Sequence, residues 1–353
     1  MEATGPSADI VLSSRVRLAR NIEGIPFPHL MNDEQTARVM GLAEEGAKEL
    51  NRYGFLGRVE LFQLSEVSPL ERQVLVEKHL ISPQQAREVK GKAVAISEDE
   101  TVSIMVNEED HLRIQCLFSG LQLAQAWELA NRVDDALEGK INFAFSERRG
   151  YLTACPTNAG TGIRASVMMH LPALVMTNQA PRVFHTINQL GLAIRGLYGE
   201  GTEAKGNIFQ VSNQITLGRS EEDIVAHLNG VVTQLIDHER QARAALQKEA
   251  GEQLEDRIGR AHGILSSARI MTSDEAMKLI SDVRLGIDLG IITNVSQKAM
   301  NELLVVTRPA YLQKLAGREL SPFDRDLKRA ALIRSKINPA AAGYRKAGPR
   351  PQP

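Results

Sequence analysis

The sequence has little of what several classes of protein require. Its 353 residues include two cysteines, Cys116 and Cys155, which are too few for a disulfide framework and favour a reducing compartment, the cytoplasm. Residues 1–8 carry no basic stretch followed by an apolar run, so no signal peptide is predicted. Apolar runs such as His170–Met176 are far shorter than the ~20 residues of a membrane span. The formal net charge of -1 and the single Trp argue against nucleic acid or an anionic membrane as a partner.

The composition is that of a globular protein with substantial cores, since 43% of the residues are apolar and 24% are charged. Up to about Gly218 short β-type runs alternate with amphipathic helices, and from Ser220 onward the pattern is almost purely helical. We therefore predict an α+β domain over 1–245, an all-helical domain over 246–340 and a disordered tail over 341–353. Lys and Arg gather toward the C-terminal end, with eight of them against two Asp over 321–350.

Short, often β-branched runs bounded by Gly, Pro, Asn or charged residues predict the strands. They are Asp9–Leu12, Arg58–Leu64, Ala93–Ser97, Val102–Val106, Leu112–Phe118, Leu152–Cys155, Arg164–Met169, Leu192–Leu197 and Ile208–Ser212. The fourth and fifth runs are close enough for a hairpin, so the sheet is predicted to be largely antiparallel with helices on its flanks. Periodic apolar spacing predicts helices over Asp33–Leu50, Pro69–His79, Leu121–Leu137, Pro181–Leu190, a long helix through His238–Arg260, one from Thr272 or Ser273, Asn294–Thr307 and Ser321–Lys336.

Arginine at strand and loop positions is the most distinctive feature of the first domain. The set is Arg15, Arg17, Arg20, Arg113, Arg164 and Arg195. A guanidinium inside an apolar run needs an anionic partner, because a buried unpaired charge is very costly. For any one of them a structural pair with a carboxylate is the better interpretation. Six together favour a site that holds a triphosphate without a P-loop, since the sequence has no G-x-x-x-x-G-K-[ST] motif.

Three further segments carry candidate chemistry. Asn107–His111 is an acidic turn between two apolar runs, which is also typical of a solvated hairpin. Arg195–Glu203 is a Gly-rich loop with two carboxylates. Cys155–Gly162 places a cysteine before a polar turn, where it can be a small buried side chain or a low-pKa thiolate. No Cys/His set has the spacing of a zinc site.

These segments together resemble the phosphagen (guanidino) kinase family of creatine and arginine kinases. The resemblance rests on Ser13–Arg17, Asn107–His111, Cys155–Asn158, Gly162–Ser166, Arg195–Glu203 and Val211–Glu221, and runs from about Ile10 to Arg243. It implies a phosphagen-kinase-like catalytic domain over 1–245 that transfers the γ-phosphoryl group of ATP to a guanidinium. It also implies Mg²⁺ carried on the phosphates, with no direct protein ligand.

The resemblance further implies roles for individual residues. Glu109 would be the general base, Glu200 a second carboxylate on the guanidinium, and Cys155 a thiolate beside it. The residues implied to surround ATP are Ser13, Ser14, Arg15, Val16, Arg17, His79, Arg113, Arg164, Ala165, Ser166, Val167, Met168, Arg195, Gly196, Leu197, Tyr198, Gly199 and Glu200.

The order of segments differs from that of kinases acting on free guanidino compounds. Their helical N-terminal domain has no counterpart before Ser13, and a helical segment follows the catalytic part. This arrangement resembles the branch of the family that phosphorylates arginine side chains of proteins. It implies protein substrates, an activator protein, a heat-shock repressor, Clp-type degradation, a stress response and a homodimer. Two alternatives stay open, a kinase of free arginine and a non-catalytic phosphoarginine-binding adaptor. A DNA-binding regulator that uses the basic tail is disfavoured.

A last motif lies in the predicted helical domain. Arg325 and Arg329 are separated by one helical turn and share a face with Asp326 beside them. By composition alone this is a solvated helix face. The resemblance implies instead that Arg325, Asp326, Arg329 and Ala330 form an allosteric phosphoarginine-binding site.

Overall fold

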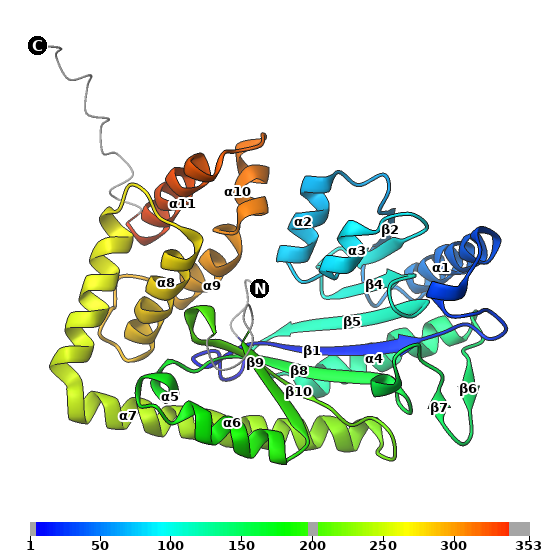
Figure 1. The fold of residues 1–353 in the computed structure, drawn as a ribbon, viewed down its shortest axis with the longest axis horizontal. Coiled ribbons are helices and arrows are strands. Elements are labelled where there is room, and N and C mark those ends of the chain that lie inside the picture. Colours follow the sequence, from blue (N-terminus) through cyan, green and yellow to red (C-terminus); the bar gives the residue numbers. More distant parts are fainter. Residues whose placement is uncertain (1–4, 197–203, 339–353) are drawn as a thin grey trace, which may run out of the picture. The chain divides into compact units, whose positions relative to one another are not determined.

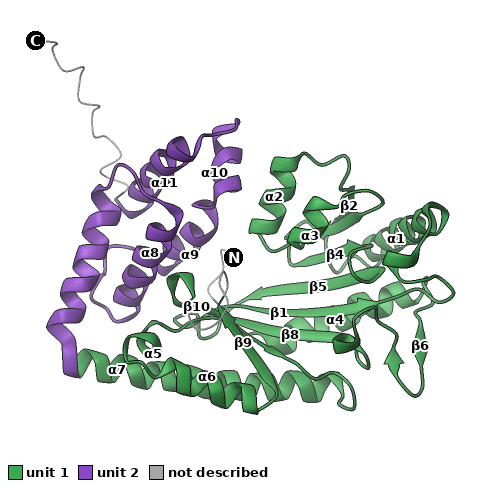
Figure 2. Ribbon diagram, in the orientation of Figure 1, with its two compact units in different colours: residues 1–248 green, residues 249–353 purple. Residues whose placement is uncertain are grey.

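The computed structural model describes residues 5–196 and 204–338. The chain forms two compact units, Met1–Lys248 and Glu249–Pro353, which Figure 2 shows in separate colours. The tail predicted over 341–353 lies outside the described residues.

The first unit is built on an eight-stranded sheet in the order β2-β3-β4-β5-β1-β8-β10-β9 (Figure 1). All its pairings are antiparallel, as the sequence predicted, and β4 and β5 form the expected hairpin. The strands are β1 (Val11–Arg20), β2 (Val59–Gln63), β3 (Ala93–Ser97), β4 (Val102–Val106), β5 (Leu112–Ser119), β8 (Ile163–His170), β9 (Leu192–Gly196) and β10 (Ile208–Asn213). A separate two-stranded hairpin joins β6 (Phe145–Ser146) and β7 (Gly150–Tyr151).

Alternation along the strands gives this sheet one apolar face and one polar face. On β1, Val16 and Leu18 are completely buried, whereas Arg15 and Arg17 alternate with them and therefore point to the other side. The register places Ser166 of β8 opposite Arg15 and Gln115 of β5 opposite Arg17. The polar face therefore continues from strand to strand across the middle of the sheet.

The apolar face shares one core with five helices, α1 (Asp33–Tyr53), α4 (Leu123–Glu138), α5 (Pro172–Met176), α6 (Ala180–Gln189) and the first part of α7 (Glu221–Ser267). The sequence marks their ends. Asn32 and Gln35 form a capping box at the start of α1, and Gly54 ends it in the left-handed conformation. Cys116 lies in this core, where burial raises the pKa of its thiol.

The polar face is covered only in part. Helices α2 (Pro69–Glu77) and α3 (Pro83–Arg87) belong to a second, smaller core with Val94 and Ile96 of β3 and Met105 of β4. Farther along the sheet, the same face of β5, β1, β8, β9 and β10 lines a cavity instead. Three short 3-10 turns, η1 (Pro28–Leu30), η2 (Pro156–Asn158) and η3 (Lys205–Asn207), lie in the connections.

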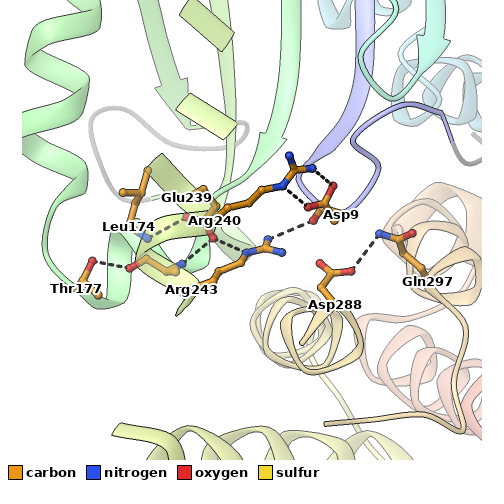
Figure 3. A network of polar contacts seen from close by, with 9 residues as sticks. Asp9, Leu174, Thr177, Glu239, Arg240, Arg243, Asp288 and Gln297 are labelled. Carbon is orange, nitrogen blue, oxygen red and sulfur yellow. Dashed lines mark hydrogen bonds and ion pairs between the residues drawn. The ribbon is translucent and has the colours of Figure 1, made fainter. Parts of the chain in front are cut away.

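A buried carboxylate of α7 binds the start of a short helix that follows β8 (Figure 3). Glu239 accepts hydrogen bonds of 3.0 Å from the backbone N–H groups of Ala173 and Leu174, at the start of α5 (Pro172–Met176). Arg243 donates to the same carboxylate at 2.9 Å, and Arg240 donates to Asp9. Burial raises the pKa of Glu239, and these donors oppose that rise. The network holds the chain entering β1 and the chain leaving β8 against one helix.

Two strand predictions need correction. The first strand runs from Val11 to Arg20 instead of ending at Leu12, because Val16 and Leu18 are buried on one face while Arg15 and Arg17 point to the other. The strand predicted over Leu152–Cys155 is absent. The N–H of Leu152 donates to the carbonyl of Ala144, and that of Ala154 donates to the carboxylate of Asp110. These two backbone N–H groups are therefore not available for hydrogen bonds to a neighbouring strand of the main sheet. The short helices α3 and α5 were not predicted.

The described part of the second unit is all-helical, as predicted. It contains the end of α7, which has a non-helical residue at Ala250, followed by α8 (Ser273–Asp288), α9 (Gln297–Val306), α10 (Pro309–Ala316) and α11 (Pro322–Ile337). Thr272 caps α8, and Pro309 begins the unpredicted α10. Within the described residues, no helix is sufficiently long and apolar to traverse a membrane.

Candidate active site

A cavity of about 390 Å³ opens on the polar face of the sheet. Its size is that of a site for a small molecule. It brings together seven residues singled out from the sequence: Arg15, Arg17, Glu109, Arg113, Cys155, Arg164 and Arg195. The five arginines come from four different strands, β1, β5, β8 and β9. Thr157, Asn158, Gln210 and Ser212 complete the lining.

The arginines of this cavity repel one another. Burial, together with the charges of Arg113 and Arg164, lowers the pKa of Arg15 to about 10, so it remains a cation at neutral pH. Burial and the neighbouring arginines also lower the pKa of Arg17 and that of Arg164. The buried Nε of Arg17 has no hydrogen-bond partner in the described part of the chain. A polyanion in the cavity would relieve this repulsion and supply the missing acceptors.

One arginine already has a carboxylate partner. Arg113 donates to Glu108 at 2.6 Å, and Ser82 donates to the other oxygen of Glu108 at 2.7 Å. Burial opposes ionisation of Glu108, but Arg113 and these hydrogen bonds outweigh it and lower the pKa of that carboxyl. Arg15 instead makes neutral contacts, with the Gln210 amide oxygen at 2.9 Å and the Ser166 hydroxyl at 3.4 Å.

Glu109 is exposed in the turn between β4 and β5, and its loop is held rigidly. Asn107 takes the left-handed conformation, with φ of 55°, and its side chain donates to the carbonyl of Gly91 at 2.9 Å. Asp110 accepts hydrogen bonds from the Asn21 amide at 2.6 Å and from the Ala154 N–H at 2.7 Å. Burial raises the pKa of Asp110, and those two donors oppose the rise. The carboxylate of Asp110 thereby ties the Glu109 loop to the segment that carries Cys155.

Cys155 is half-buried at the start of η2, with its Sγ 3.0 Å from the hydroxyl of Thr157. The Thr153 hydroxyl donates to the Cys155 carbonyl at 2.8 Å. Cys155 and Glu109 both act electrostatically on Arg164, in the direction that raises its pKa. They therefore form the less cationic end of a cavity that is otherwise dominated by arginine.

His79 lies with the residues predicted to surround ATP, although α2 ends before it. Its φ of 62° is left-handed, and its carbonyl accepts from the Gln115 amide at 2.7 Å. It lines a small neighbouring cavity together with Ser13, Arg15, Leu117, Ser166, Met168 and Gln210.

Other predicted nucleotide residues are not brought into the cavity by their side chains. Val16, Ala165 and Val167 are completely buried in the apolar core. The Ser14 hydroxyl, also buried, donates to the Gly120 carbonyl at 2.8 Å. Gly196 ends β9. Leu197, Tyr198, Gly199 and Glu200 lie outside the described residues.

Arg20 does not join the other arginines. It is buried on the opposite face and donates twice to Asp134, with its shortest N–O distance 2.6 Å. Its guanidinium also lies 3.4 Å from the centre of the Tyr151 ring. Arg20 therefore has the structural carboxylate partner that the sequence analysis considered for each arginine.

In the second unit, Arg329 and Ala330 are buried in α11. Arg329 donates to the carbonyls of Thr307 and Met271, both at 2.9 Å, and to the carboxylate of Asp326. Arg325 is half-buried beside them. Arg329 therefore joins α11 to the end of α9 and to the segment before α8.

The described residues contain no group of three His, Cys, Asp or Glu side chains that could hold a metal ion.

Comparison with known proteins agrees with this geometry. The profile of the ATP:guanido phosphotransferase C-terminal catalytic domain matches residues 41–242, and that of the protein-arginine kinase McsB C-terminal domain matches residues 251–347. The protein-arginine kinase of Symbiobacterium thermophilum is 61% identical over 338 residues, 96% of each chain. That of Geobacillus stearothermophilus is 58% identical over 337 residues, 96% of this chain and 93% of its own.

The chain belongs to the protein-arginine kinase family of guanido phosphotransferases. The resemblance found in the sequence and the predicted fold class are both confirmed. Among solved structures, lombricine kinase is similar with a TM-score of 0.59 and 26% identity, covering 67% of this chain and 68% of its own. The duplicated taurocyamine kinase of Schistosoma mansoni shares the fold, with a TM-score of 0.57 and 24% identity over 77% of this chain and 41% of its own.

The geometry of the cavity also shows residues that the sequence did not single out. Asp110, Thr157, Gln210 and Ser212 all belong to the site or support it. Asp110 and Thr157 stand inside motifs that the sequence singled out, and Gln210 and Ser212 alternate on a predicted strand. The sequence showed where these four residues stand, but it did not show which residues they contact.

Proposed function

We propose that the protein transfers the γ-phosphoryl group of ATP to the guanidinium of arginine side chains in proteins. The observation that carries this proposal is the single cavity in which five arginines meet Glu109 and Cys155. The names of the similar proteins, which are protein-arginine kinases, support the choice of acceptor.

The arginine-rich part of the cavity would hold the phosphates. Arg15, Arg17, Arg164 and Arg195 present cations without a carboxylate partner in the described part of the chain, and Arg113 can exchange Glu108 for a phosphate oxygen. Phosphoryl transfer depends mainly on positioning and charge neutralisation, which such a group supplies. Bound Mg²⁺ would contribute further neutralisation of the phosphate charge.

The end of the cavity with Glu109 and Cys155 would hold the acceptor. A guanidinium has a pKa above ~12, so its nitrogen attacks poorly until a proton is removed. Glu109 takes that proton as the new N–P bond forms and the bond from the γ-phosphorus to the ADP oxygen breaks. Cys155, as a thiolate, would favour the bound cation, and Glu200 would be a second carboxylate on the guanidinium.

The second unit would sense the product. We propose that Arg325, Asp326, Arg329 and Ala330 bind phosphoarginine and activate the kinase. The guanidinium of Arg325 has no hydrogen-bond partner in the described part of the chain, and Asp326 already accepts from the guanidinium of Arg329. Free phosphoarginine is expected to raise the rate of the wild type and to leave the rate of Arg325→Ala unchanged. Activation of both proteins alike would contradict a site at Arg325.

Wider roles follow from the family resemblance. We propose that the phosphorylated proteins are passed to Clp-type degradation in a stress response, that a heat-shock repressor is among the substrates, and that an activator protein participates. We also propose a cytoplasmic homodimer.

The test of the proposed function is incubation of the protein with Mg·ATP and unfolded casein, followed by mass spectrometry for acid-labile phosphate on arginine. Free arginine is assayed in parallel. Phosphate on casein arginines, with little free phosphoarginine, is the expected result. Phosphorylation of free arginine alone would replace the proposal with a small-molecule kinase. Phosphorylation of neither would favour the non-catalytic adaptor.

A further inference from the structure

A second cavity, of about 420 Å³, lies in the first unit beside the β6–β7 hairpin. We call it the hairpin cavity. Phe145, Arg148 and Arg149 come from the hairpin, and Leu217, Arg219 and Glu221 come from the chain that enters α7. The reaction proposed above uses none of these side chains.

The two cavities share a wall. Thr157 and Asn158 line the active-site cavity. Two residues farther along the chain, Gly160 and Thr161 line the hairpin cavity. One loop, residues 157–161, therefore contributes to the linings of both cavities.

The shared wall is fixed in place. The Thr216 hydroxyl lies 3.0 Å from the Thr157 carbonyl and 2.6 Å from the Ala159 carbonyl. Gly160 has a φ of 99°, and a Cβ at this position would lie 2.8 Å from the Thr216 carbonyl oxygen. The spacing between the two cavities is thus part of the fold.

The lining of the hairpin cavity is amphipathic. Phe145 and Leu217 each keep 59% of their surface exposed, although both are large apolar side chains. Such side chains at the edge of a binding cleft are typical of a protein-contact surface.

The charges of the hairpin cavity favour an acidic occupant. Arg148, Arg149 and Arg219 have no ion-pair partner among the described residues. Glu221 and Asp223 also line it, but both lie in the first turn of α7, where the free N–H groups of the helix stabilise carboxylates. The three arginines are therefore the charged groups of this cavity that a bound partner would neutralise. An acidic residue in the substrate would also offset the repulsion that its arginine meets in the cationic active site.

We infer that the hairpin cavity docks the substrate polypeptide beside its target arginine, taking an apolar or aromatic side chain together with an acidic one. This inference rests on the proposed function, because it names the polypeptide that the kinase would select.

The test uses two synthetic peptides with the same single arginine and the same phenylalanine. One carries two flanking aspartates, and the other carries lysines at those positions. The enzymes are the wild type, R148E/R149E and, as a matched control, R38E, which changes an exposed arginine on α1 outside the cavity. N-acetylarginine amide serves as an acceptor too small to reach the hairpin cavity.

We expect R148E/R149E to raise KM for the aspartate peptide about tenfold, with kcat unchanged, and to lower KM for the lysine peptide. Turnover of N-acetylarginine amide is expected to be equal in all three enzymes. Equal KM values for the aspartate peptide in wild type, R38E and R148E/R149E would overturn the inference. A change of oligomeric state in R148E/R149E with unchanged KM would overturn it as well and assign the surface to a second copy of this chain.

Binding separates failure of this inference from failure of the proposed function. Fluorescence anisotropy of the labelled aspartate peptide, with citrulline in place of arginine, needs no catalysis. An affinity about tenfold weaker for R148E/R149E than for R38E supports the docking surface even if no phosphoarginine forms. Equal affinities would overturn it whether or not the kinase is active.

Discussion

Individual arginines in this sequence have two different roles, and strand alternation separates them. Arg15 and Arg17 are two residues apart on β1 and share the polar face, whereas Arg20 is an odd number of residues away and lies on the buried face. The sequence grouped all three near one site. The arginines of the sequence therefore pointed to the cavity. Which of them line it depends on whether an odd or an even number of residues separates them along β1.

His111 is the residue whose titration bears most directly on the Glu109 loop. It is completely buried, accepts a hydrogen bond from the Ile22 N–H through Nδ1 at 2.9 Å, and donates from Nε2 to the Pro26 carbonyl at 2.7 Å. This pattern requires the neutral ring. Burial lowers the pKa of His111 below 6.5, and the bond to Pro26 opposes that shift.

The sign of the pH effect follows from that depressed pKa. The stabilising contribution of neutral His111 is complete above the unfolded pKa and is lost as pH falls through the folded pKa. Between about pH 7.5 and about pH 5 the wild type is expected to lose more free energy of unfolding than His111→Gln, measured by urea denaturation. An equal loss in both proteins would show that His111 does not titrate with unfolding.

At the scale of elements, local patterns predicted most of the architecture. Val102–Val106 and Ala93–Ser97 are observed with the predicted bounds, and α8 begins at Ser273, one of its two predicted starts, with Thr272 as its cap. These elements depend on period-two or period-3.6 patterns and on caps, which are all local. The predictions failed where backbone donors go to distant acceptors, as the Ala154 N–H goes to Asp110 in place of a ladder.

The connections between elements also determine how much of the site was visible in the sequence. Glu109 and Cys155 stood in recognisable motifs, Arg113 was singled out as an arginine inside an apolar run, and the cavity brings all three together. The role of Gln210 was not visible, because it is defined by a hydrogen bond to Arg15, 195 residues away. Long-range contacts of this kind depend on strand order, which no local pattern encodes.

At the scale of the whole molecule, net charge conceals the feature that matters most for function. With a formal net charge of -1, the protein as a whole does not attract anions. The active-site cavity nevertheless gathers five arginines on one face of the sheet. The chain therefore concentrates positive potential where a nucleotide would bind and balances it elsewhere. The hairpin cavity extends the same distribution to the segment that would carry the target arginine.

The central claim is that different residues of one cavity bind the two substrates. The arginines bind the nucleotide, and Glu109 acts on the acceptor guanidinium. The most direct measurement compares wild type and Glu109→Ala in two assays, phosphoarginine formation on casein and nucleotide titration. Loss of a general base predicts a fall in transfer of at least about 100-fold. Nucleotide affinity should stay within about threefold, because the arginines are intact. Transfer that survives in Glu109→Ala, or nucleotide affinity that falls in step with it, would contradict the account.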